Sequence, residues 1–162
     1  MFVLRFLSEV AGALYFFIPA YIANTLPGIF GGGPPLDGGR HFSDRKRLLG
    51  DGVTIRGFIV GVAGGTAVGA LMGRPIEGFL LSLGALLGDS AGSFLKRRLG
   101  IKRGDPAPVL DQLNFVAGAL ILISFVASVS LDYIIILLVV TPFGHLAVNM
   151  IGYSLKLKKV PW

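Results

Sequence analysis

Four side chains in the middle of the chain place a carboxylate, a hydroxyl and two cations on one face of a predicted helix. Asp89, Ser93, Lys96 and Arg97 fall at positions i, i+4, i+7 and i+8 of a largely apolar run, and residues at this spacing share one side of an α-helix. An ionisable residue inside an apolar run is costly and usually marks a functional site facing a helix bundle. The alternative is that Asp89 only forms an ion pair with Lys96 or Arg97 near the helix end.

A second carboxylate follows after a short connection. Asp111 opens the next apolar run, and Asn114 lies one turn further on. Residues 99–110 are rich in glycine and proline, which predicts a short non-helical turn that brings Asp111 back towards Asp89. Carboxylate oxygens are preferred ligands of Mg²⁺, and Lys and Arg bind phosphate oxygens. The pattern predicts phosphoryl or nucleotidyl transfer, with Asp89 and Asp111 as Mg²⁺ ligands and Lys96 and Arg97 beside them as catalytic residues.

Residues 24–52 form a second region in which charged residues accumulate. The stretch is rich in glycine and proline and contains Asp37, Arg40, Asp44 and Asp51. Its composition predicts an irregular loop, and glycine-rich backbone can present several N–H groups to an anion. It lacks the GxxxxGK[ST] pattern and is not a P-loop. Loops of this composition are also common as plain connectors, so this one does not identify a site by itself.

The elements that must position these residues are predicted to be membrane-spanning helices. Hydrophobic residues make up 53% of the chain and charged residues 15%, with a mean hydropathy of +0.75, which lies outside the range of soluble domains. Crossing a bilayer as a helix takes about 20 apolar residues. Runs of this kind predict spans at residues 2–24, 53–72, 76–94, 113–129 and 133–151. We expect an all-α integral membrane protein with one transmembrane domain (1–162), whose loops 25–52 and 95–112 form the active site.

Basic residues are unevenly distributed between the connections. They cluster in the two long loops and the C-terminal tail: Arg40, Arg45, Lys46, Arg47 and Arg56; Lys96, Arg97, Arg98, Lys102 and Arg103; Lys156, Lys158 and Lys159. By the positive-inside rule these regions are cytoplasmic and the N-terminus lies outside. This predicts a multi-pass protein of the plasma membrane with its active site on the cytoplasmic face. The same bias explains the net charge of +6 without nucleic acid as a partner.

Glycines recur at four-residue spacing in two predicted spans. The positions are Gly57, Gly61, Gly65, Gly69 and Gly73 in one span and Gly84, Gly88 and Gly92 in the next. Each set lines one helix face, where missing side chains let another backbone approach closely. The stripes predict packing seams, either inside the chain or between two copies in a homodimer.

The residues around the second basic cluster resemble the signature of a known family, the membrane CTP:phosphatidate cytidylyltransferases. The similar motif is Ser93-x-x-Lys96-Arg97-x₄-Lys102 followed by Asp111-Gln112-Leu113-Asn114-Phe115. Two further stretches resemble the archaeal branch of that family, the CDP-archaeol synthases: Asn24…Pro27…Gly33-Pro34…Asp37-Gly38-Gly39 and Arg47…Leu49-Gly50-Asp51-Gly52…Thr54…Arg56-Gly57. The similarity runs from about residue 24 to residue 115 and continues through the hydrophobic tail.

The resemblance implies transfer of CMP from CTP to an unsaturated archaeal ether-lipid phosphate, digeranylgeranylglyceryl phosphate, with release of pyrophosphate. It implies that Asp89 and Asp111 hold Mg²⁺ as the cofactor. The substrate-binding residues expected on this basis are Ser93, Lys102, Asn114, Asn24, Asp37, Gly38, Arg40, Arg47 and Asp51. The expected partners are CTP, the isoprenoid glycerol-ether lipid phosphate and membrane lipids.

Other functions fit parts of the pattern. A bacterial-type phosphatidate cytidylyltransferase would act on an ester lipid instead. A small membrane transporter could use Asp89 as a cation or proton relay, but its polar residues would continue across the bilayer, whereas those of this chain gather at one end. A CDP-alcohol phosphotransferase would carry a dense run of four aspartates, which this sequence lacks.

Overall fold

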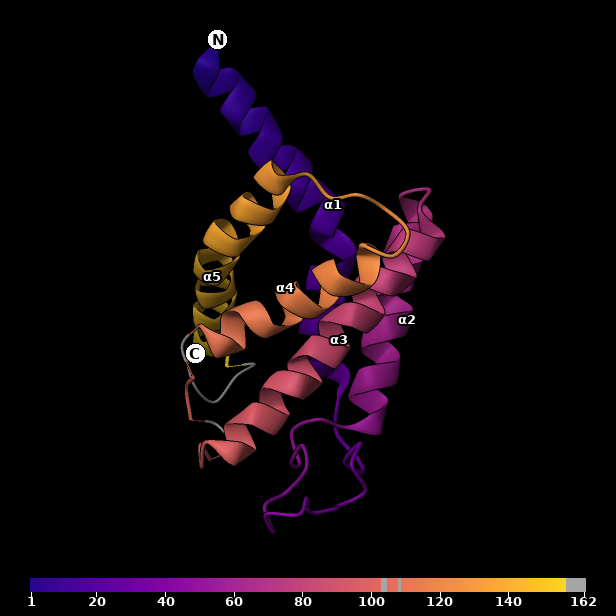
Figure 1. Cartoon of the computed structure of the whole chain (residues 1–162), viewed down its shortest axis with the longest axis vertical. Helices are drawn as coiled ribbons and strands as arrows, with labels where there is room; N and C mark the ends of the chain where they lie inside the picture. The colour runs from indigo at the N-terminus through magenta and orange to yellow at the C-terminus, as the bar shows by residue number, and fades with distance from the viewer. Residues whose placement is uncertain (103–104, 108, 157–162) are drawn as a thin grey trace.

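In a computed structural model the chain forms a bundle of helices, as the sequence predicts (Figure 1). The structure describes residues 1–102, 105–107 and 109–156, apart from the side chain of Phe2. The helices are α1 (Phe2–Phe30), α2 (Ile55–Leu71), α3 (Pro75–Arg98), α4 (Leu110–Ile123) and α5 (Leu131–Ser154). Arg103, Lys158 and Lys159, which belong to the predicted basic clusters, lie outside the described residues.

Three of these helices, α1, α3 and α5, are long and apolar enough to cross a membrane. The two others are apolar but shorter, with 17 residues in α2 and 14 in α4. The largest differences from the expected spans are at two boundaries. Helix α1 continues through Pro27 to Phe30, so the first loop begins later than residue 25. Helix α4 ends at Ile123 instead of residue 129, because backbone bonds of the Ser124–Ala127 turn close off its last turn.

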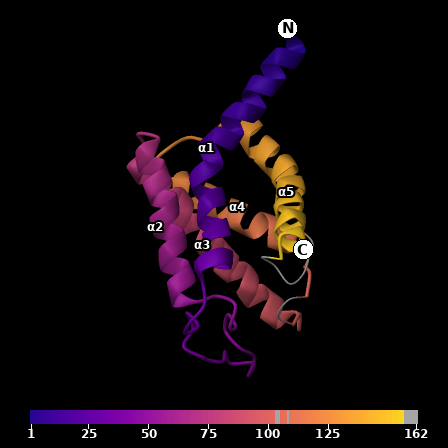
Figure 2. The same cartoon turned by 180° about the vertical axis from the view of Figure 1, so that it is seen from behind.

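Helix α3 is central to the bundle, because it packs against α1, α2 and α4. Helix α5 lies beside α1 and α4, and Figures 1 and 2 show it on the opposite side of the molecule from α2. The core contains Phe17, Leu81, Phe115, Ile123 and Leu137, all fully buried. The first residues of α1 project beyond the other helices. This packing fixes α4 against α3, the two helices that carry the predicted metal ligands.

The glycine stripes form seams inside the chain. A Cβ atom on Gly61 would lie 2.6 Å from the Ala23 carbonyl oxygen of α1. One on Gly84 would lie 2.5 Å from the Gly118 carbonyl oxygen of α4. Real Cβ atoms do not approach this closely, so α2 and α3 pack at distances that only glycine permits. The predicted seams are confirmed as contacts within one chain except at Gly73, which lies beyond the end of α2 and packs against no neighbour among the described residues.

The first loop, residues 31–54, is ordered by backbone hydrogen bonds although it is rich in glycine and proline. At its base the Leu36 N–H donates to the Val53 carbonyl oxygen at 2.8 Å. Near its tip the Phe42 N–H donates to the Lys46 carbonyl oxygen at 2.9 Å. The Thr54 hydroxyl oxygen caps α2, accepting hydrogen bonds from the Gly57 and Gly32 N–H groups. The loop therefore closes over the same end of the bundle as the C-terminal end of α3 (Figure 1).

Candidate active site

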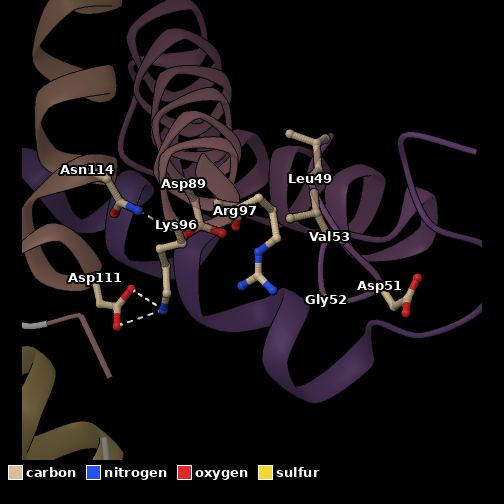
Figure 3. Close-up of a pocket in the computed structure, with 11 residues that line it drawn as sticks. Leu49, Asp51, Gly52, Val53, Asp89, Lys96, Arg97, Asp111 and Asn114 are labelled. Carbon is tan, nitrogen blue, oxygen red and sulfur yellow. Dashed lines mark hydrogen bonds and ion pairs between the residues drawn. The ribbon is translucent and has the colours of Figure 1, made fainter. Parts of the chain in front are cut away.

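A polar pocket lies where α3, α4 and the first loop meet. Its volume is about 170 Å³. Figure 3 shows side chains from the two helices gathered on one side of it, with loop residues 49–53 opposite. The lining residues are Leu49, Gly50, Asp51, Gly52, Val53, Asp89, Ser93, Lys96, Arg97, Asp111 and Asn114. The structure thus brings the helix-face residues Asp89, Ser93, Lys96 and Arg97 together with Asp111.

Lys96 and Asp111 form an ion pair across the α3–α4 interface. The Lys96 Nζ atom lies 2.8 Å from Oδ1 and 3.1 Å from Oδ2 of Asp111. The Ala107 N–H also donates to Oδ2 at 2.9 Å, which ties the α3–α4 connection to the same carboxylate. In the described part of the chain Asp89 forms no ion pair with Lys96 or Arg97, and Lys96 contacts the second carboxylate instead.

Asp89 has a different partner. Its Oδ1 atom accepts a hydrogen bond of 3.3 Å from the Asn114 side-chain amide, and among the described residues this is the hydrogen bond that its carboxylate receives. Asn114 lies against Gly92 of α3, where a Cβ atom would collide with the amide. Glycine at position 92 therefore lets Asn114 lie close enough to α3 to reach Asp89.

Arg97 extends from α3 towards the loop side of the pocket (Figure 3). Its Nε atom is buried and has no hydrogen-bond partner within the described part of the chain. Its side chain runs past Gly50, whose φ of +97° is a conformation that favours glycine. Because the Arg97 side chain lines the pocket, its guanidinium can contact an anion that enters there.

Asp37 is predicted to bind substrate, but in the structure its carboxylate is surrounded by groups of the first loop. Its side chain is fully shielded from solvent. Oδ1 accepts hydrogen bonds from the Gly39 N–H (3.0 Å) and the Arg47 guanidinium (2.9 Å). Oδ2 accepts from the N–H groups of Leu49 (2.9 Å) and Gly50 (3.1 Å). The anion that the loop backbone surrounds is therefore this carboxylate.

Electrostatics agree with this arrangement. Burial by itself raises the pKa of the Asp37 carboxyl, but the Leu49 N–H, the Arg47 guanidinium and the other N–H donors outweigh burial. They hold the pKa of Asp37 well below its usual range. Asp37 is therefore ionised at neutral pH, and it joins the turn at Gly39 to residues 47–50 of the same loop.

The remaining predicted substrate-binding residues divide into two groups. Ser93, Asp51 and Asn114 line the pocket, although Asp51 lies apart from the cluster of helix side chains in Figure 3 and binds Arg47 at 2.6 Å. Outside the pocket lining are Asn24, Asp37, Gly38, Arg40, Arg47 and Lys102. Of these, Gly38, Arg40 and Lys102 are exposed, and Asn24 lines a separate groove between α1 and α5.

Several lining residues carry no titratable side chain and were not predicted as site residues. They are Leu49, Gly50, Gly52 and Val53. These residues contribute backbone groups and shape to the pocket wall. The only sign of this in the sequence is the pair of glycines on either side of Asp51. The Gly50 conformation is the reason that a glycine is needed there.

The donor set is suited to Mg²⁺. Within the described residues no group of three or more His, Cys, Asp or Glu side chains gathers in one place. Asp89 and Asp111 nevertheless line the same pocket from different helices. Mg²⁺ is commonly held by one or two carboxylates together with substrate phosphates, and this pair matches that requirement.

Comparison with known proteins shows the family. The CarS-like family, described as CDP-archaeol synthase, matches residues 6–162. The CDP-archaeol synthase of Methanopyrus kandleri is 52% identical over 95% of this chain and 94% of its own length. That of Methanocaldococcus jannaschii is 45% identical over 93% and 96%. A solved structure described as an intramembrane enzyme for archaeal membrane lipid biosynthesis is 42% identical, with a TM-score of 0.81 over 86% of this chain and 94% of the other.

These similarities extend over nearly the whole chain, and the intramembrane neighbour agrees with the three long apolar helices in supporting an integral membrane protein. They also confirm the resemblance to the CDP-archaeol synthases that the sequence motifs indicated. The chain belongs to the CarS-like family of CDP-archaeol synthases.

Proposed function

We propose that this chain transfers CMP from CTP to digeranylgeranylglyceryl phosphate, forming the CDP-activated lipid and pyrophosphate. The observation that carries the proposal is the convergence of Asp89, Asp111, Lys96 and Arg97 on one pocket in a member of this family. Two carboxylates and two cations in one cavity provide for a metal-bound triphosphate and for the charge that develops as its phosphate bond breaks.

The reaction requires no covalent intermediate on the protein. An oxygen of the lipid phosphate attacks the α-phosphorus of CTP, the new P–O bond forms, and the bond to the β-phosphate breaks with pyrophosphate as the leaving group. Lys96 and Arg97 bind phosphate oxygens and offset the charge on the leaving group. A phosphate monoester is largely a dianion near pH 7, so the attacking oxygen needs no general base.

Asp89 and Asp111 would hold Mg²⁺ in this pocket, with Asn114 orienting the Asp89 carboxylate through its hydrogen bond. When bound, the metal supplies neutralisation of phosphate charge. Lys96, which contacts Asp111 here, would contact a phosphate oxygen instead when the triphosphate occupies the pocket. Ser93, one turn before Lys96 on the same helix face, is placed to donate its hydroxyl to the triphosphate.

The surroundings of the pocket support a lipid as the second substrate. An apolar groove between α3 and α4 shares Asn114 with the pocket and is otherwise lined by residues such as Leu87, Leu95 and Ile121. A lipid phosphate could therefore place its head group in the polar pocket while its chains remain among apolar side chains. Any homodimer would use a surface other than the glycine seams, because these are filled by helices of the same chain.

We further propose that the pocket faces the cytoplasm at the plasma membrane, on the basis of the basic residues around it. The chain has no cysteine, so single cysteines can report its orientation. Ser43→Cys in the first loop should be protected from an impermeant thiol reagent in intact cells, whereas Ser128→Cys between α4 and α5 should react. The reverse pattern would refute this orientation.

The direct test is to incubate the purified protein with CTP, Mg²⁺ and either the archaeal ether-lipid phosphate or an ester phosphatidate. We expect pyrophosphate release and a CDP-lipid with the ether substrate. Faster turnover of the ester lipid would indicate a bacterial-type specificity. The absence of any CDP-lipid product would refute cytidylyl transfer and return attention to a transport function.

A further inference from the structure

Arg98 follows Arg97 in the sequence but faces the first loop instead of the pocket lining. Its guanidinium carbon lies 4.4 Å from the centre of the Phe94 ring and 5.3 Å from that of Phe42. The two rings meet edge to face at 5.4 Å. A guanidinium stacked on two aromatic rings gains cation–π and packing energy. One ring belongs to α3 and the other to the loop, so Arg98 joins the two elements.

Polar contacts connect the same segments. The Arg98 Nε atom lies 2.8 Å from Oδ2 of Asp44, and its Nη2 atom donates to the Arg47 carbonyl oxygen. In return, the Lys46 Nζ atom donates to the Arg98 carbonyl oxygen at 2.8 Å, one of the carbonyl groups that a helix end leaves without a partner. The tip of the loop is therefore attached to the end of α3 through both side chain and backbone.

From Arg98 the contacts lead to the pocket. The side chain of Arg47, whose carbonyl Arg98 holds, binds Asp37 and Asp51. Asp37 in turn holds the N–H of Gly50, and Gly50 lies against the Arg97 side chain. The position of the pocket wall opposite α3 thus depends on how the loop tip sits on Arg98.

We propose that Arg98, acting through Asp44, is a positioning residue that sets the distance between the Gly50–Gly52 backbone and Arg97, and thereby the affinity for CTP. The inference rests on the proposed function in that CTP is taken as the occupant of the pocket. Arg98 itself is not in the pocket lining and touches no reacting atom.

The base of the loop is held independently of this contact. Leu36 and Ile55 donate backbone hydrogen bonds to Val53 and Pro34, and the Thr54 hydroxyl binds the Gly32 N–H. Removing the Arg98–Asp44 contact therefore loosens the tip, which the Lys46 and Phe42 contacts still hold in part, while the helices and the loop base stay in place. The expected consequence is a change in CTP binding without unfolding.

The test compares Asp44→Asn and Arg98→Lys with two control substitutions at exposed positions outside the pocket, Asp105→Asn and Arg56→Lys. Asp44→Asn keeps an oxygen for the Lys46 N–H but removes the charge that faces Arg98. Asp44→Glu restores the charge and serves as the conservative rescue. Amide hydrogen exchange of residues 38–53, the equilibrium dissociation constant of CTP, KM for CTP and kcat are measured in the full-length protein.

For Asp44→Asn and Arg98→Lys we expect faster exchange in residues 38–53 and a rise of about tenfold in KM for CTP, as for loss of one charge-assisted contact. The values of kcat and KM for the lipid phosphate should change little, and Asp44→Glu should recover most of the CTP affinity. Residues of α2, α3 and α4 should exchange as in the wild type.

Unchanged loop exchange or unchanged CTP affinity in Asp44→Asn would overturn the inference. The inference would also be overturned if amide exchange in the helices, kcat and the KM values of both substrates all changed together. That result would indicate that the Arg98–Asp44 contact only stabilises the fold. A wild-type protein that binds CTP but transfers no CMP would refute the proposed function alone. A working enzyme in which Asp44→Asn binds CTP normally would refute this inference alone.

Discussion

Asp37 and Asp89 are both predicted site residues, but their carboxylates have very different surroundings. Each oxygen of Asp37 accepts two hydrogen bonds, all from groups of the first loop. Asp89 accepts one bond of 3.3 Å from Asn114 among the described residues and faces the pocket. A carboxylate with all its acceptor sites used stabilises the protein, whereas one with unused sites can bind a ligand. The comparison separates the scaffold of the site from its reacting surface.

The largest effect should follow from removing a charge on the reacting surface. Asp89→Asn and Asp111→Asn each preserve shape but remove an anionic ligand for Mg²⁺, and turnover should fall by about 10²–10³-fold or more. The measurement is kcat at saturating Mg²⁺, with the thermal unfolding midpoint as the control for folding. Near-normal activity in either variant would end the assignment of these two carboxylates.

A smaller loss is expected at Arg97. Replacement by Lys keeps the charge but removes the planar fork, so kcat/KM for CTP should fall roughly ten- to a hundredfold. Arg98 is not a neutral reference for this substitution, because it attaches the loop; Arg56→Lys is the matched control. Loop exchange should stay unchanged in Arg97→Lys, which distinguishes a ligand contact from a positioning residue. Equal activity in Arg97→Lys and Arg56→Lys would contradict a phosphate contact.

On the scaffold side, Asp37→Asn should affect stability more than chemistry. An amide has one oxygen, so in either orientation it leaves a pair of donors, Gly39 with Arg47 or Leu49 with Gly50, without an acceptor. We expect a loss of about 1–3 kcal/mol in the stability of the loop, seen as faster proteolysis within residues 38–53. Asp105→Asn is the control. If the variant resisted proteolysis like the wild type but could not bind CTP, Asp37 would be a ligand contact and not part of the scaffold.

The smallest effect concerns pH. Because the folded pKa of Asp37 is lowered, its contribution to stability is fully present above the unfolded pKa of about 4 and is lost only as pH falls through the folded value. The difference in thermal midpoint between the wild type and Asp37→Asn should therefore be constant from neutral pH down to about pH 5. It should shrink only at lower pH. A difference that disappears between pH 7 and pH 5 would show that the carboxyl is not held as described.

The two regions also differ in how far the sequence could predict them. The helix-face residues from Asp89 to Arg97 repeat with the period of a helix, and the short connection before Asp111 limits how far α4 can lie from α3. Their convergence on one pocket could be predicted for these local reasons. The sequence could not predict that Lys96 would bind Asp111 and not Asp89. Which carboxylate Lys96 reaches depends on how closely α4 packs against α3.

The loop offered no periodic pattern. Asp37 meets the N–H groups of Leu49 and Gly50, which lie 12 and 13 residues further along, and nothing in the composition of a glycine- and proline-rich segment specifies such a pairing. The same limit explains why backbone groups at Gly50 and Gly52 were not predicted to line the pocket. The sequence also predicts the end of α1 too early, because Pro27 lies inside the helix, where proline more often breaks one.

The seam between α3 and α4 makes this protein intolerant of mutation at positions without reactive side chains. Gly88 immediately precedes Asp89, and a Cβ atom there would lie 3.1 Å from the Cα atom of Gly118 and closer still to the Asn114 carbonyl oxygen. A single methyl group at position 84 or 88 would push α4, and Asp111 with it, away from α3. In a saturation screen for growth, such seam positions would appear as intolerant as the carboxylates, although they carry no reactive side chain. Sequence change in this chain is therefore restricted along a line of glycines that a search for reactive side chains would not identify.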